Sequence, residues 1–167
     1  MARKVFFSFH YTRDSHRVAQ IRNSNVLTQN YLESTFLDRA AWESIKRNGK
    51  QAIQNWIDTN MSGTSVVVLC FGLETYTRPW VKYELQKAHR EGKGIVAIDM
   101  AGMKNLRQDK DVRGPNPLLH ATDSAGTALY YYDMYRTYSW LDVLGNESGR
   151  YLIDDWIELA AKLAGRP

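Results

Sequence analysis

Glu84 is the residue whose type and position could do chemistry, because it stands where the surrounding sequence predicts an apolar side chain. Residues 65–71 form a run that is apolar after Ser65 and contains three β-branched valines, which is typical of a strand covered on both faces. Pro79 then marks the first turn of a helix, in which Glu84 lies about 40° from Trp80 and inside the apolar stripe. Such a helix places Glu84 near the crevice where open α/β sheets bind ligands, and a carboxylate there could stabilise positive charge. The alternative is a solvated surface glutamate, as most glutamates on helices are.

The segments that would position Glu84 alternate between strands and helices. Strands are predicted from apolar and β-branched runs at residues 4–10, 35–37, 65–71 and 94–99. A first helix follows the first strand and could be capped by Thr12 or Asp14. One amphipathic helix is predicted between the second and third strands from apolar residues at helical spacing, namely Trp42, Ile45, Ala52, Ile53, Trp56 and Ile57. This order predicts an α/β fold with a doubly wound, mainly parallel sheet.

The C-terminal part of the chain departs from this alternation. Residues 100–128 show no periodicity, and so long a loop is predicted to be a lid or binding loop, with a surface insertion as the alternative. Residues 129–132 are predicted as an edge strand, whereas residues 135–140 carry no clear pattern. The last helix is predicted at about residues 148–164, with a buried stripe formed by Leu152, Ile153, Trp156, Ile157, Ala160 and Leu163.

Length and composition favour a single domain over residues 1–167. The chain has 167 residues, of which 44% are hydrophobic, and this is enough for one sizeable core. No apolar run approaches the ~18 residues of a membrane span, so a soluble, cytoplasmic protein with no membrane partner is expected. Cys70, the single cysteine, excludes an internal disulfide and is expected to be a small buried hydrophobe. The net charge of +4 arises from interspersed signs without an RNP, KH or helix-turn-helix pattern, so nucleic-acid binding is not favoured.

Familiar catalytic and cofactor motifs are absent from the sequence. There is no G-x-x-x-x-G-K-[ST], G-x-G-x-x-G, G-x-S-x-G or H-E-x-x-H. These absences exclude the commonest NTPase, dehydrogenase, hydrolase and zinc-protease types. The four histidines have no metal-ligand spacing, and no metal site is predicted. His10 ends the first strand on the presumed ligand side, although a structural histidine is the favoured interpretation.

Four short parts of the chain carry a resemblance to a known family. They are V-F-F-S-F-H-Y at residues 5–11 followed by Asp14, W-V-K-Y-E at residues 80–84, G-P-N-P at residues 114–117, and the closing Y-S-W and D-W-I-E. The first resembles the first box of TIR domains, and the second is similar to the W-x-x-x-E helix that supplies their catalytic glutamate. In this order, over nearly the whole chain, they resemble the TIR-like domain family of bacterial Thoeris anti-phage defence.

This resemblance implies a flavodoxin-like doubly wound sheet, mainly parallel, of four to five strands with helices on both faces. It implies that NAD⁺ is a substrate, with no cofactor, and that its nicotinamide N-glycosidic bond is cleaved. The product would be an ADP-ribose or cyclic ADP-ribose-type signal that activates a partner effector protein, and the chain could form a homo-oligomer. The catalytic role maps onto Glu84.

The predicted substrate-binding residues lie near strand ends, at the start of the catalytic helix or on the long loop. The resemblance places Phe7 and Ser8 in the pocket wall. Phe9 and Tyr11 are candidate aromatic walls, and Asn116 is a candidate polar contact from the lid. The full set comprises Phe7, Ser8, Phe9, His10, Tyr11, Asp38, Trp80 and Asn116.

One carboxylate is sufficient for this reaction on physical grounds. The nicotinamide ring is a cationic pyridinium while it is bound to the ribose, and it leaves as a neutral base. The proton donor that glycosidases supply with a second acid is therefore unnecessary. Ionised Glu84 could stabilise the oxocarbenium-like ribose, and an aromatic crevice closed by a loop would favour cyclisation by excluding water. Two other classes of function stay open. One is a non-catalytic TIR-like interaction module in which Glu84 pairs with Lys or Arg, and the other is a flavodoxin-like or nucleic-acid-binding protein.

Overall fold

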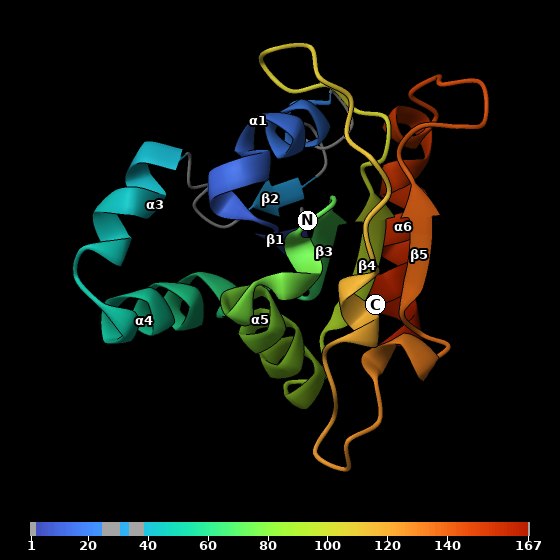
Figure 1. The fold of residues 1–167 in the computed structure, drawn as a ribbon. Helices are drawn as coiled ribbons and strands as arrows, with labels where there is room; N and C mark the ends of the chain where they lie inside the picture. Colours follow the sequence, from blue (N-terminus) through green and yellow to red (C-terminus); the bar gives the residue numbers. More distant parts are fainter. Residues whose placement is uncertain (1–2, 25–30, 34–38, 167) are drawn as a thin grey trace.

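The computed structural model describes residues 3–24, 31–33 and 39–166, which form an α/β fold around one five-stranded sheet (Figure 1). The strands are β1 (Arg3–Ser8), β2 (Tyr31–Glu33), β3 (Val66–Phe71), β4 (Gly94–Asp99) and β5 (Arg136–Ser139). The α-helices are α1 (Tyr11–Arg22), α3 (Arg39–Lys46), α4 (Lys50–Met61), α5 (Pro79–Arg90) and α6 (Gly149–Leu163). Short 3₁₀ helices are η1 (Thr75–Thr77), η2 (Pro117–Leu119) and η3 (Leu129–Tyr131).

The sheet has the strand order β2-β1-β3-β4-β5, and every pair of neighbours is parallel. This is the order of flavodoxin-like sheets, in which the topological switch point lies between β1 and β3. β3 is the central strand, and all six of its residues are buried. The predicted fold class, a flavodoxin-like doubly wound sheet with a covered central strand, is therefore confirmed.

Helices cover both faces of the sheet (Figure 1). α6 approaches the start of β4 so closely that a Cβ added to Gly94 would lie 2.6 Å from the carbonyl oxygen of Ala160. Gly94 is in register with Val5 of β1, and side chains alternate along a strand. Phe6 and Ser8 of β1 therefore lie on the face opposite to the one that α6 covers. The Phe6 ring there meets Trp56 of α4, with ring centroids 6.0 Å apart. α4 and α5 therefore cover one face, and α6 covers the other.

Two N-terminal elements differ from the prediction. The second strand is Tyr31–Glu33, and the strand predicted at residues 35–37 lies outside the described residues. The single helix predicted from residues 42–57 is in fact two helices, α3 and α4. Gly49 separates them with a φ of 91°, a left-handed conformation that glycine adopts without strain. The apolar spacing continued across this turn and therefore concealed it.

The edge strand of the C-terminal part also differs from the prediction. Residues 129–132 do not form a strand, because Leu129–Tyr131 make the 3₁₀ helix η3. The edge strand is β5, which lies in the stretch that showed no pattern. Its R-T-Y-S side chains are exposed or half-buried, so no apolar run marks it in the sequence. The last helix, α6, agrees with the predicted one to within about a residue at each end, but Leu152 and Leu163 of its predicted buried stripe are exposed.

The long segment that follows β4 packs against the body of the protein. Met100, Met103 and Leu118 are buried. Arg17 of α1 donates from Nε to the carbonyl oxygen of Met103 at 3.1 Å, and Gln20 donates to the carbonyl oxygen of residue 104 at 2.8 Å. The first part of this segment is therefore anchored to α1.

Two expectations from composition can be compared with the structure. Cys70 is fully buried, and burial raises the pKa of its thiol, in agreement with a small buried hydrophobe. Across residues 3–24 and 39–166, no helix combines the length and apolar character needed to cross a bilayer.

Candidate active site

Glu84 lies on the buried side of α5, as its helical position predicts. The helix starts at Pro79, and the residues that it buries are Val81, Glu84, Leu85 and Ala88. Glu84 is 0% exposed. The predicted burial of this carboxyl group is confirmed, while its catalytic role stays a prediction.

Tyr11 and Ser8 contact the Glu84 carboxyl group across the switch point between β1 and β3. The Tyr11 hydroxyl oxygen lies 3.4 Å from Oε1 and 3.3 Å from Oε2 of Glu84, and 3.4 Å from the Phe7 carbonyl oxygen. The Ser8 hydroxyl also interacts with this carboxyl group, but the geometry falls short of a full hydrogen bond, and Ser8 Oγ has no other partner among the described atoms. Because Ser8 ends β1 and Tyr11 begins α1, the fold brings both predicted residues to Glu84.

Burial controls the protonation of Glu84. It raises the pKa of the carboxyl group well above its usual range, and the hydroxyls of Ser8 and Tyr11 offset this only in part. Burial and the neighbouring Glu84 likewise raise the pKa of Tyr11. Among the described side chains, no lysine or arginine forms an ion pair with Glu84. Burial therefore favours the neutral carboxyl group, and a cation beside it would lower its pKa.

Aromatic side chains pack around Tyr11, the ring that contacts Glu84. The Tyr11 ring stacks on Trp42 of α3, with a centroid distance of 4.6 Å and an interplanar angle of 27°. Phe9 lies 4.3 Å from the same ring, and Trp56 of α4 meets it edge-on at 6.0 Å. Phe9 and Tyr11 were predicted as walls, whereas the two tryptophans were predicted only as the apolar stripe of a helix. Their convergence depends on the turn between α3 and α4.

Phe7 and Trp80 contribute less directly than predicted. Phe7 neighbours Ser8 along β1, so its side chain points to the opposite face and only its carbonyl oxygen approaches Tyr11. Trp80 is half-buried at the start of α5, where its ring packs edge-on against a tyrosine of the same helix at 5.6 Å. Ser8 and Tyr11 are therefore the predicted binding residues that reach Glu84.

His10 has a structural role at the start of α1. It is the N-cap, and its Nδ1 accepts a hydrogen bond from the backbone N–H of Arg13 at 3.4 Å. The caps predicted at Thr12 and Asp14 are therefore wrong, since both residues lie inside the helix. Burial and the nearby Arg78 lower the pKa of His10 to about 4, which keeps it neutral near pH 7.

Asn116 is engaged away from Glu84. Its side-chain oxygen accepts from the backbone N–H of Leu118 at 3.0 Å, and its Nδ2 donates to Thr137 Oγ1 at 2.9 Å. It thus caps η2 and ties it to β5, while the polar substrate contact that we predicted for it stays a prediction. Asp38, the remaining predicted binding residue, lies outside the described residues.

A buried network of ion pairs, which sequence reasoning missed, lies beside this site. Asp14 is 0% exposed and accepts from Arg13 Nη1 at 2.9 Å and from Arg17 Nη1 at 2.8 Å. Arg13 also pairs through Nη2 with Asp111 at 2.7 Å. Burial raises the pKa of Asp14, and the two arginines oppose that rise. Gly72 makes room for the network, because a Cβ there would collide with the Asp111 carboxylate. The sequence signal was the i,i+3 spacing of Asp14 and Arg17.

The site offers one protonatable carboxyl group, two hydroxyls and an aromatic enclosure. After ionising, such a carboxyl group can stabilise a cation far better than in water, because the surroundings have a low dielectric constant. In the described part of the chain, no three His, Cys, Asp or Glu side chains lie close enough together to hold a metal ion.

Comparisons with known proteins can now be set beside this geometry. The family model for the "Thoeris protein ThsB, TIR-like domain" matches residues 6–105. A protein of Bacillus cereus (strain MSX-D12) named "Putative cyclic ADP-D-ribose synthase ThsB1" is 33% identical over 137 residues, which cover 80% of this chain and 71% of the Bacillus protein. The family match contains Ser8, Tyr11 and Glu84.

Proposed function

This chain belongs to the family of TIR-like domains of the Thoeris protein ThsB, and on that premise we propose that it is an NAD⁺-processing enzyme. It cleaves the N-glycosidic bond between nicotinamide and ribose and makes an ADP-ribose or cyclic ADP-ribose-type signal. The name of the Bacillus relative refers to cyclic ADP-D-ribose synthesis, which supports a cyclic product. The signal acts in anti-phage defence by activating a separate effector protein.

The observation that supports this function is a fully buried carboxyl group without a cationic partner among the described side chains. Burial of an unpaired acid costs stability, and such groups concentrate at functional sites. Glu84 also lies at the switch point, where sheets of this order bind their ligands. The interaction-module alternative predicted a Lys or Arg paired with Glu84, and no such pair supports it in the described structure.

The reaction needs what Glu84 and its neighbours provide. When the C–N bond breaks, its electron pair goes to the pyridinium nitrogen, nicotinamide leaves neutral, and positive charge develops on the ribose. A carboxylate ~4 Å from that charge contributes a Coulomb term of about 4 kcal/mol at an effective dielectric near 20. The cationic substrate lowers the pKa of Glu84, so Glu84 is ionised when its charge is needed. The Tyr11 hydroxyl, 3.3 Å from Oε2, holds the carboxylate in place.

The aromatic enclosure decides which nucleophile completes the reaction. The cyclic product forms when a ribose hydroxyl or the adenine of the same molecule bonds to the ribose carbon that nicotinamide has left, and the released proton goes to the Glu84 carboxylate. Linear ADP-ribose forms when water bonds to that carbon. Exclusion of water therefore favours the cyclic product. Because Glu84 has no exposed surface, substrate entry requires the side chains that cover it, Tyr11 among them, to move.

Product analysis tests this function directly. The purified chain is incubated with NAD⁺ in H₂¹⁸O, alone and with an extract of phage-infected cells, and the products are separated by chromatography and weighed by mass spectrometry. We expect nicotinamide and a nucleotide product in equal amounts. A cyclic product carries no ¹⁸O, whereas linear ADP-ribose carries one.

The same reaction run with Glu84→Gln is the matched control for contaminating activity. Failure of the chain to release nicotinamide under both conditions would contradict the proposed function. Equal nicotinamide release by the Glu84→Gln variant would instead contradict the role of this residue.

A further inference from the structure

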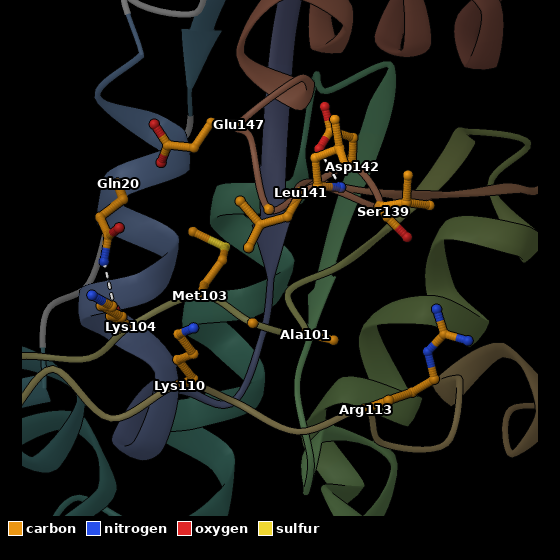
Figure 2. A pocket seen from close by; sticks show the side chains of 14 residues that line it. Gln20, Ala101, Met103, Lys104, Lys110, Arg113, Ser139, Leu141, Asp142 and Glu147 are labelled. Atoms are coloured by element: carbon orange, nitrogen blue, oxygen red, sulfur yellow. Dashed lines mark hydrogen bonds between the residues drawn. The ribbon is translucent and has the colours of Figure 1, made fainter.

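A hollow lies at the carboxyl edge of the sheet, beyond β4 and β5 (Figure 2). It has a volume of about 680 Å³, within the range of small-molecule sites. Its walls come from the segment after β4, the segment after β5 and Gln20 of α1. Figure 2 shows Lys104 and Lys110 on one side, Arg113 on the other, and Met103 and Leu141 between them.

The two lysines sit opposite each other in a tight hairpin. Lys104 and Lys110 are partners in an antiparallel bridge, and the backbone N–H of Asn105 donates to the carbonyl oxygen of Asp109 at 3.0 Å. Like charges directly opposite each other destabilise such a pair. Gln108 within the hairpin also has a φ of 66°, an uncommon conformation for a residue other than glycine. The hairpin therefore brings two positive charges together at a cost in stability.

Helix α1 holds this hairpin in place. Arg17, which is buried and paired with Asp14, donates to the backbone carbonyl oxygens of Met103 at 3.1 Å and Asp109 at 3.2 Å. Gln20 donates to the carbonyl oxygen of the bridge residue Lys104 at 2.8 Å. These bonds fix both arms of the hairpin, so the backbone is not free to separate the two lysines.

The acidic residues beside the hollow are already engaged. Asp142 accepts hydrogen bonds from the backbone of the loop after β5 and from the Ser148 hydroxyl at 2.8 Å. Glu147 pairs with Arg150 at 2.9 Å. Arg113 pairs with Asp99 at 3.2 Å. Among the described side chains, no acid pairs with Lys104 or Lys110, so the unpaired positive charge of the hollow lies on these two lysines.

An apolar surface lies between the cationic sides. Met103 is buried at the floor and Leu141 is half-buried, whereas Val143 and Leu144 stand exposed at the rim. Exposed apolar side chains beside unpaired cations suit a ligand that has both a ring and a phosphate group.

We infer that this hollow is a second ligand site, which binds a phosphate-bearing small molecule with a planar ring, of the nucleoside diphosphate class. Lys104 and Lys110 contact the phosphates, and the ring lies over Met103 and Leu141. None of the residues that line the hollow belongs to the aromatic enclosure of Glu84. The inference therefore does not depend on the proposed enzyme function.

Calorimetric titration of the full chain with ADP tests this site. We expect saturable binding that weakens at least about tenfold in the Lys104→Gln/Lys110→Gln double variant, because each lost charge-assisted contact lowers affinity. The Lys50→Gln/Lys162→Gln double variant removes the same charge from exposed positions on α4 and α6, and we expect its affinity to stay within about twofold of the parent. Adenosine, which lacks phosphate, should bind at least about tenfold more weakly than ADP. Inorganic phosphate should compete with ADP, since it shares the group that the lysines contact.

The Glu84→Gln variant separates this site from the proposed active site. We expect it to bind ADP as the parent does. Loss of ADP binding in Glu84→Gln with full binding in the Lys104→Gln/Lys110→Gln variant would place ADP at the active site and overturn the inference. Absence of ADP binding to the parent chain would overturn it as well.

Discussion

Glu84 and Asp14 are both fully buried carboxyl groups, yet their surroundings differ. Asp14 accepts hydrogen bonds from two arginines, whereas the polar groups that contact Glu84 are the hydroxyls of Tyr11 and Ser8. Burial raises the pKa of both groups, but at Asp14 the arginines oppose the rise with full positive charges. Burial alone therefore does not mark a reactive carboxyl group. Burial without a cation does, because a bound substrate can supply the missing charge.

The largest expected effect is a difference in unfolding free energy between variants of the two carboxyl groups. Asp14→Asn should lower the free energy of unfolding by about 3–5 kcal/mol, because it leaves Arg17 buried without its counter-charge. Glu84→Gln should leave the protein at least as stable at pH 7, because it replaces a group whose neutral form burial already favours. Urea denaturation followed by circular dichroism measures both. An Asp14→Asn variant as stable as the parent would remove the structural role assigned to that residue.

The pH dependence of stability should sharpen the same contrast. The folded pKa of Glu84 lies above its ordinary value of 4.5, so the folded state binds the proton more tightly than the unfolded state. Unfolding free energy is therefore lost as the pH rises above 4.5 towards the folded pKa, by about 1.4 kcal/mol for each pH unit.

The Glu84→Gln variant has no carboxyl group to ionise, so its unfolding free energy should not fall in this way. The difference in unfolding free energy between the variant and the parent should therefore grow with pH across that window. Urea denaturation of both proteins at several pH values from 4.5 upward measures the difference. Parallel stability curves for the two proteins would show that the folded pKa of Glu84 is not raised.

The hydroxyl that contacts Glu84 should affect catalysis more than stability. Tyr11→Phe removes the group 3.3 Å from Oε2 and should lower the rate of nicotinamide release about tenfold. It should also move the acidic limb of the pH–rate profile upward, because that hydroxyl lowers the pKa of Glu84. Tyr83→Phe is the control, since Tyr83 lies on α5 but donates to Asp58 at 2.6 Å. Equal rates and profiles for the two variants would dismiss Tyr11 as a positioning residue.

The smallest expected effect concerns Asn116, which we predicted as a substrate contact. Asn116→Ala removes the cap of η2 and the bond to Thr137, so the unfolding free energy should fall by about 1 kcal/mol. The KM for NAD⁺ should stay within about twofold of the parent value, because the residue is engaged away from Glu84. Steady-state kinetics measures this KM, and a tenfold increase would support the predicted contact between Asn116 and the substrate.

Local patterns in the sequence were sufficient for the centre of this fold. The unbroken apolar run of β3 and the phase of Glu84 along α5 depend on nearest neighbours and on helical periodicity, and both predictions are confirmed. The parallel pairing of the strands follows from the alternation of strands and helices, whereas their order in the sheet was not predicted. Ser8 and Tyr11 reach Glu84 because the carboxyl ends of parallel neighbours meet at one edge.

The parts that the sequence did not reveal depend on long-range contacts or lack a periodic signal. β5 is short, polar and exposed, so it has no apolar run. Trp42 and Trp56 meet Tyr11 from two helices that the turn at Gly49 separates. Asp111 pairs with Arg13, 98 positions earlier in the chain, and no local spacing indicates such a partner. Asn116 was predicted from its loop, whereas its side chain is used within the fold.

Nicotinamide release by Glu84→Gln, compared with the parent and with Glu91→Gln, tests the central claim most directly. Glu91 lies at the exposed end of the same helix and pairs with Lys87 at 3.3 Å, so its substitution controls for the loss of a carboxylate as such. We predict that Glu84→Gln loses at least about 10²-fold in rate, as expected for removal of a charge aimed at the developing cation, and that Glu91→Gln keeps the parent rate. Undiminished release by a folded Glu84→Gln variant would contradict the claim that this buried, unpaired carboxyl group carries the reaction.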